Sequence, residues 1–138
     1  MKRQRLQADY EIDFELLGIV STFKDFKLAW NLNQNLHLSL VKKKDLRLQF
    51  VDHELVVSNF LYETENSQMW LIKNRSHEID ERDGTYFVPE LTEMDYFLRI
   101  SGAEYDTDWL ESLRSIVGIE YVLKIDLDQL KSKENFIF

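Results

Sequence analysis

The sequence predicts an α+β fold in which an antiparallel sheet carries two helices on one face. Several short segments alternate apolar and polar residues, as half-buried strands do. Two other segments repeat apolar residues every three or four positions, as amphipathic helices do. The segments follow the order strand, helix, several strands, then strand, helix, strand. This order favours a split β-α-β arrangement, ferredoxin-like, with an extra hairpin, and the 138-residue length favours a single domain over residues 1–138.

The first half of the chain begins with a predicted strand over residues 10–21, where apolar and acidic residues alternate. The first predicted helix spans residues 23–35. We expect its apolar face to consist of Phe23, Phe26, Ala29, Trp30 and Leu36. Residues 36–40 and 46–50 alternate again. They predict two short strands, or one interrupted strand, with lysines between them at a turn or an edge.

The second half begins with a predicted hairpin of residues 55–63 and 69–73. A strand over residues 94–101 leads into a helix over residues 108–117, which ends before Gly118 in a left-handed cap. A last strand is predicted over residues 119–127. All three tryptophans lie on apolar faces in this interpretation, so we expect a core that contains Trp30, Trp70 and Trp109.

The composition excludes several classes of function. The chain has no cysteine, which rules out zinc–thiolate sites, iron–sulfur clusters and thiol nucleophiles. Its four glycines are isolated, so it has no phosphate-binding loop, and we expect no cofactor. The formal net charge of −8 argues against a nucleic-acid partner, because binding along phosphates needs a basic surface. No segment approaches the roughly 18 apolar residues of a membrane span, so we expect a cytoplasmic protein without a membrane partner.

Residues 88–96 read Val-Pro-Glu-Leu-Thr-Glu-Met-Asp-Tyr, and we call them the signature segment. They resemble the signature of the bacterial family known as IPExxxVDY proteins. Pro89, Glu90, Asp95 and Tyr96 match it, while Val and Met stand where the family has Ile and Val. The length of the chain and its C-terminal end are similar as well. The family has no assigned activity, so the resemblance implies a relative and no mechanism.

The signature segment is the first candidate for a functional patch, formed by Pro89, Glu90, Glu93, Asp95 and Tyr96. Three carboxylates around a rigid proline could bind Mg²⁺ or Ca²⁺, or act as acid and base if burial raised one pKa. Glu93 and Asp95 would share a strand face if the strand began that early. We favour a structural alternative, in which the carboxylates cap backbone amides and Tyr96 packs in the core with its hydroxyl bonded.

Two further sets of residues could hold a metal ion. Asp52, His53 and Glu54 place a histidine between two acids, although a turn between strands explains the triplet equally well. Asp126 and Asp128 alternate and so would share one strand face, but Asp128 is also a natural cap for a short helical turn. We favour the structural explanation in both cases.

A candidate basic patch is the only positive cluster within the predicted fold. It consists of Lys42, Lys43, Lys44 and Arg47. Such a patch could contact RNA if the four cations were free and lay side by side.

The C-terminal end is a candidate contact, because three large apolar residues follow a polar stretch: Phe136, Ile137 and Phe138. Leaving them in water would be unfavourable. We expect this tail to dock in a groove, either on its own domain or on a neighbouring subunit.

The leading functional hypothesis is a non-catalytic binding or regulatory module, acting through protein or small-ligand contacts. It rests on the lack of a nucleophile with its base, of a cofactor loop and of a strong metal spacing. Two alternatives stay open, a small carboxylate-based metal-dependent enzyme and an RNA- or ribosome-associated protein. We also expect a homodimer, formed through an exposed edge of the hairpin at residues 55–73.

Overall fold

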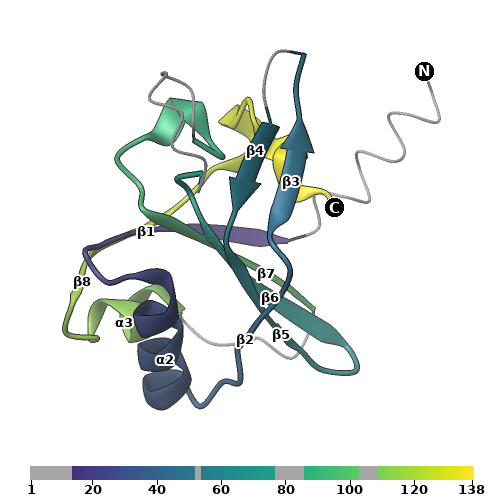
Figure 1. Ribbon diagram of the computed structural model, residues 1–138. Helices are drawn as coiled ribbons and strands as arrows, with labels where there is room; N and C mark the ends of the chain where they lie inside the picture. Colours follow the sequence, from purple (N-terminus) through teal and green to yellow (C-terminus); the bar gives the residue numbers. More distant parts are fainter. Residues whose placement is uncertain (1–13, 52–53, 77–85, 103–108) are drawn as a thin grey trace.

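The computed structural model describes residues 14–51, 54–76, 86–102 and 109–138. Its main feature is a six-stranded antiparallel sheet in the order β2-β5-β6-β7-β1-β8, beside a two-stranded ribbon of β3 and β4 (Figure 1). The α+β prediction is therefore confirmed.

The bounds of the elements follow the chain. The large sheet consists of β1 (Glu15–Ser21), β2 (Val41–Lys42), β5 (Asn59–Glu63), β6 (Ser67–Lys73), β7 (Tyr96–Gly102) and β8 (Ile119–Lys124). The ribbon consists of β3 (Leu46–Gln49) and β4 (Glu54–Val57). The helices are α2 (Asp25–Leu36) and α3 (Trp109–Arg114), with short 3-10 helices η1 (Pro89–Leu91), η2 (Leu127–Gln129) and η3 (Lys133–Phe136).

The strand order contains the predicted split β-α-β arrangement. Strands β8, β1, β7 and β6 lie side by side and alternate in direction. Strands β1 and β6 are both antiparallel to β7, so they run parallel to each other, and α2 lies between them in the chain. Strands β7 and β8 have the same relation across β1, with α3 between them. The predicted hairpin is confirmed for β5 and β6, whereas residues 55–57 of its predicted first arm belong to β4 in the separate ribbon. Strands β5 and β2 extend the sheet beyond β6.

One face of the sheet is covered by both helices, which lie together below the sheet in Figure 1. Leu28 and Leu32 of α2 are fully buried there, and so is Leu113 of α3. They pack against the sheet residues Ile19 and Leu98. The placement of both helices on one face is as predicted.

The other face of the sheet carries a second core. Leu16 and Phe97 of the sheet pack there against Val57 of the ribbon, Phe87 before η1 and Phe136 of the tail. The sheet is thus buried on both faces, whereas the alternating pattern predicted half-buried strands. The prediction failed because the cover of this face comes from three short segments that are far apart in the sequence.

The apolar face predicted for the first helix is confirmed for Ala29, which is buried, and for Phe23 and Leu36, which pack against the core, but it is wrong for the two aromatic residues within the helix. Helix α2 buries Leu28, Ala29 and Leu32, while Phe26 is 65% exposed and Trp30 is 60% exposed. Leucines at positions i and i+4 form a stripe as continuous as the aromatic one, and the structure turns that stripe inward. Among the other tryptophans, Trp109 is buried and Trp70 is partly buried.

Exposure of Trp30 leads to a direct test. We expect Trp30→Ala to change the free energy of unfolding by less than about 0.5 kcal/mol, because the ring contributes little buried area. Leu32→Ala, two residues further along on the buried face, is the matched control and should cost about 2–5 kcal/mol. Urea denaturation measures both. A loss above about 1 kcal/mol for Trp30→Ala would mean that α2 is rotated from the position described above.

Several predicted boundaries shift or fall outside the described residues. Strand β1 begins at Glu15, and residues 10–13 of the predicted strand lie outside the described residues. Gly118 has a φ of 105°, which confirms the left-handed position between α3 and β8. A Cβ at Gly118 would also clash with the ring of Phe23, so glycine is required there for a second reason.

The predicted exposed edge of the hairpin is wrong. Strand β6 lies between β5 and β7, and β2 pairs with β5 at Phe60 and Leu61. The outer strands of the sheet are β2 and β8. On β8, the Arg114 guanidinium donates to the carbonyl oxygen of Val122 at 3.3 Å. The homodimer stays a prediction, but the exposed hairpin edge from which it was inferred is covered by β2.

Candidate functional site

The signature segment connects the second core to β7. Val88 is fully buried, and the next residue, Pro89, begins η1 at a position where the missing N–H costs no hydrogen bond. Met94 is buried against Gly18 of β1, and β7 begins at Tyr96. The segment therefore bends tightly between two buried anchors, and its carboxylates lie on the outside of the bend.

Glu90 connects the signature segment to the C-terminal tail. Its carboxylate accepts hydrogen bonds from the Ser132 backbone N–H at 2.8 Å and from the Ser132 hydroxyl at 2.7 Å. Partial burial raises the pKa of the Glu90 carboxyl, but the hydrogen bonds from Ser132 and neighbouring amides outweigh it and hold the net pKa below its ordinary value. Glu90 thus acts as a cap for backbone amides, the structural alternative favoured from the sequence.

Asp95 and Tyr96 hold the connection between β1 and α2. The Asp95 carboxylate accepts from the Ser21 backbone N–H at 2.9 Å. The hydroxyl of Tyr96, which is buried, donates to the Phe23 carbonyl oxygen at 2.6 Å. Burial, together with the carboxylates of Asp25 and Asp95, raises the pKa of Tyr96 above its ordinary value. The hydroxyl keeps its proton and serves as a donor.

Asn74 is the residue that organises the signature segment, and the sequence reasoning missed it. Its side chain is fully buried. The amide nitrogen donates to the carbonyl oxygens of Leu91 at 3.0 Å and Met94 at 2.8 Å, while the amide oxygen accepts from the Val88 N–H at 2.8 Å. The only signal in the sequence is one polar residue directly after an apolar strand, which is equally typical of an exposed loop.

The three signature carboxylates do not converge. Glu90 faces the tail and Asp95 faces the β1–α2 connection, while Glu93 is exposed. The shared strand face considered for Glu93 and Asp95 does not form, because β7 begins only at Tyr96. Within the part of the chain that the structure describes, no three histidine, aspartate or glutamate side chains are grouped to hold a metal ion.

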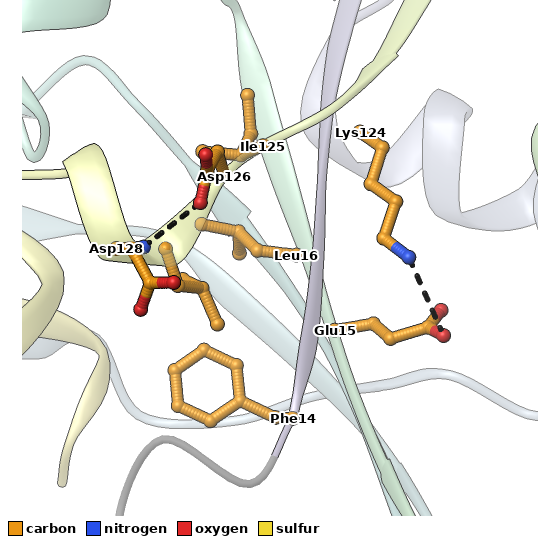
Figure 2. Close-up of a pocket in the computed structure, with 8 residues that line it drawn as sticks. Phe14, Glu15, Leu16, Lys124, Ile125, Asp126 and Asp128 are labelled. Carbon is orange, nitrogen blue, oxygen red and sulfur yellow. Dashed lines mark hydrogen bonds and ion pairs between the residues drawn. The ribbon is translucent and has the colours of Figure 1, made fainter.

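The Asp126–Asp128 pair lines an open pocket at the end of β8, of about 490 Å³ (Figure 2). Here Asp126 is the cap of η2, because its carboxylate accepts from the Asp128 N–H at 3.0 Å. The expectation that Asp128 caps this turn is therefore wrong, because the cap is Asp126, two residues earlier. On the other side of the pocket, Glu15 pairs with Lys124 at 4.0 Å. Asp52 and His53 of the other candidate set lie outside the described residues.

The basic patch is partly neutralised by neighbouring carboxylates. Lys42 forms an ion pair with Asp45 at 2.9 Å, and Arg47 forms one with Glu54 at 3.1 Å. Two of the four predicted cations are thus already paired, and the exposed side chains of Lys43 and Lys44 remain. Lys42 lies on the edge strand β2, as expected for lysines at an edge.

The tail docks against its own chain. Phe136 is fully buried, and its ring meets the rings of Phe87 at 4.9 Å and Phe97 at 5.5 Å between centroids, both in edge-to-face contact. Ile137 is partly buried, whereas Phe138 is 52% exposed. The docking expected from the apolar character of these residues is therefore carried mainly by Phe136.

A pocket of about 410 Å³, which we call the signature pocket, opens beside Asp95 and Tyr96. Its walls come from the end of β1, the start of α2, the end of β6 and the signature segment. They include Ser21, Thr22, Phe23, Lys24, Lys73, Arg75, Tyr86, Thr92, Met94, Asp95 and Tyr96. Sequence reasoning did not bring these residues together, because they come from segments that are remote in the chain.

The signature pocket is lined by three cations and one carboxylate. Lys24 and Lys73 form no ion pair with any described residue. The Arg75 guanidinium donates to the Tyr86 hydroxyl at 3.2 Å and lies over its ring. Lys24 is also the N-cap residue of α2 and provides no side-chain hydrogen bond to the first turn. The three cations outnumber the Asp95 carboxylate on the wall and the Asp25 carboxylate in the first turn of α2, so the local charge is positive.

Comparison with models of known protein families finds no match, and neither does a search of the curated proteins. Among the helices that the structure describes, none combines the length and the apolar character needed to cross a membrane.

Proposed function

We propose that this protein is a non-catalytic binding module that holds a small anionic molecule in the signature pocket. The observation that carries the proposal is the meeting of Lys24, Lys73 and Arg75 at one pocket of a chain whose formal net charge is −8. A carboxylate or phosphate group on the ligand would supply the counter-charge that the described residues do not give Lys24 and Lys73.

The size and surface of the pocket support a small ligand. Its volume of about 410 Å³ lies in the range of ligand-binding clefts, roughly 300–1,000 Å³. Tyr86 and Met94 provide apolar surface, and the hydroxyls of Thr22 and Thr92 are polar groups able to orient a bound molecule. The three cations would then contact the anionic group while the remainder of the ligand packs on the apolar wall.

The chemistry of the wall supports binding rather than catalysis. The Asp95 carboxylate already accepts a hydrogen bond from the Ser21 N–H, and the Tyr96 hydroxyl already donates one to the Phe23 carbonyl oxygen. The raised pKa of Tyr96 makes its hydroxyl a poor base near neutral pH. In this proposal both residues are positioning groups, which fix the β1–α2 connection as one wall of the pocket.

The test is a binding titration that compares loss of positive charge in the signature pocket with the same loss in the basic patch. Citrate and inorganic phosphate are the probes, titrated at constant ionic strength with calorimetric detection. We expect the variant Lys73→Gln with Arg75→Gln to bind about tenfold more weakly than the parent, because two charged hydrogen-bond donors are lost. The variant Lys43→Gln with Lys44→Gln removes the same charge from the basic patch and should bind like the parent.

Two results would contradict the proposal. One is an equal loss in both double variants, which would mean that the anions respond to net charge and not to the pocket. The other is the lack of saturable binding of either probe to the parent protein. Thermal unfolding of each variant shows whether the fold is kept.

A further inference from the structure

A second cluster of aromatic and cationic side chains lies on the sheet face opposite the helices. Arg99 of β7 is directly opposite Trp70 of β6 in the strand register, and Phe14 and Phe138 lie beside it. We call these four residues the Arg99 platform. It shares no residue with the signature pocket, so it is independent of the function proposed above.

Aromatic rings hold the Arg99 guanidinium in place. Its central carbon lies 4.5 Å from the ring centroid of Phe14 and 5.4 Å from that of Phe138. The ring of Phe138 in turn meets Trp70 edge to face, with centroids 4.9 Å apart. Stacked between rings, a guanidinium keeps its planar donors in a fixed orientation, which favours recognition of a carboxylate.

The donors of Arg99 lack a partner among the described residues. Its Nε atom is buried without any hydrogen-bond acceptor, and no described carboxylate forms an ion pair with it. On the same sheet face, the Glu63 carboxylate accepts a hydrogen bond from the Gln68 side-chain amide at 2.8 Å and forms no ion pair with Arg99. Burial lowers the pKa of Arg99, which reflects the cost of a charge placed there without a counter-charge.

We propose that the Arg99 platform is the docking site for an acidic segment of a partner protein. A carboxylate of that segment accepts from the Arg99 guanidinium, and an adjacent apolar side chain of the segment packs on the rings of Trp70 and Phe138. The missing counter-charge thus comes from the partner.

The residue types and the exposure of the platform support a protein segment over other ligands. Tryptophan and arginine, together with tyrosine, are enriched at the energetic centres of protein interfaces. Phe138 is 52% exposed, so the platform presents apolar surface to the outside. A polyanion such as RNA would find a single cation, Arg99, at this platform. The rest of the chain brings the formal net charge to −8, which disfavours the approach of a polyanion.

The test uses a minimal acidic peptide and side-chain NMR signals. The probe is the acetylated and amidated peptide Gly-Glu-Phe-Gly, and the matched control is the same peptide with Gln in place of Glu. In the ¹⁵N-labelled full chain, the Nε–H signal of Arg99 reports on the guanidinium and the indole N–H signal of Trp70 reports on the rings. We expect saturable shifts of both signals with the Glu peptide, and at least about tenfold weaker binding of the Gln peptide.

Substitutions identify the group that recognises the carboxylate. Arg99→Gln should weaken binding of the Glu peptide about tenfold, followed through the Trp70 signal. Arg99→Lys should also weaken it, because an ammonium lacks the planar pair of donors. The variant Lys73→Gln with Arg75→Gln should bind the peptide like the parent, which separates this site from the signature pocket. Unchanged backbone amide signals outside the platform show that each variant is folded.

Four outcomes would overturn the proposal. The first is no saturable shift at peptide concentrations up to about 10 mM. The second is equal binding of the Glu and Gln peptides, and the third is tighter binding of a short RNA at the same signals. The fourth is a shift of the Arg99 signal in the peptide-free variant Glu11→Gln with Asp13→Asn, which would show that the chain itself supplies the carboxylate.

Discussion

Replacing Asn74 with alanine is expected to lower the free energy of unfolding by about 4 kcal/mol. The side chain is fully buried and makes three hydrogen bonds with the backbone of the signature segment. Alanine would leave the Val88 N–H and the carbonyl oxygens of Leu91 and Met94 without these partners. The Leu91 carbonyl keeps its hydrogen bond from the Met94 N–H at 3.1 Å, so two buried polar groups are left unsatisfied. Each of them costs roughly 1–3 kcal/mol.

Urea denaturation followed by circular dichroism measures this loss. Asn31→Ala is the matched control, because the Asn31 amide donates to the Lys27 carbonyl on the exposed surface of α2. Its effect should stay within about 0.5 kcal/mol. If Asn74→Ala were as mild as the control, the signature segment would not depend on this side chain, and its bend would have another cause.

Replacing Phe136 with alanine is the second large effect, with an expected cost of about 3–5 kcal/mol. The ring is fully buried and packs on the rings of Phe87 and Phe97 within the second core. Removing it would leave a cavity where the tail, the signature segment and the sheet meet. The same substitution should also free residues at the end of the chain, because Phe136 is the main anchor of the tail.

The matched control is Phe138→Ala, two residues further along the same tail. Phe138 is 52% exposed, so its loss should cost less than about 1 kcal/mol. Urea denaturation gives the free energies, and hydrogen exchange of the tail amides reports on docking. The docking of the tail would be refuted by similar, small losses in the two variants together with unprotected tail amides in the parent.

The two predictions together concern how the signature segment is stabilised. Asn74 fixes its backbone from β6, and Glu90 joins it to the tail through Ser132. Asp95 and Tyr96 then hold the β1–α2 connection, which forms a wall of the signature pocket. Loss of Asn74 is therefore expected to weaken anion binding as well as the fold, whereas loss of Phe138 is expected to leave the anion pocket unchanged.

The sequence by itself determined the local structure and the order of elements. Period-two segments became β5, β6 and β7, and the position of Gly118 after α3 is left-handed as expected. These predictions succeeded because alternation, helical period and glycine caps depend on residues that are close in the sequence. The apolar end of the tail also indicated docking correctly, since water disfavours such side chains wherever they lie.

Only the tertiary structure decided which face of α2 is buried and what each polar group binds. Leucine and aromatic stripes on α2 satisfy the same helical period, so the choice of Leu28 over Trp30 depends on the sheet that receives the helix. The partners of Asp95 and Glu90 lie 74 and 42 residues away in the chain. The cations of the signature pocket likewise come from the residue before α2, the last residue of β6 and the segment just beyond it. Such contacts carry no local period, because they arise when distant segments pack together.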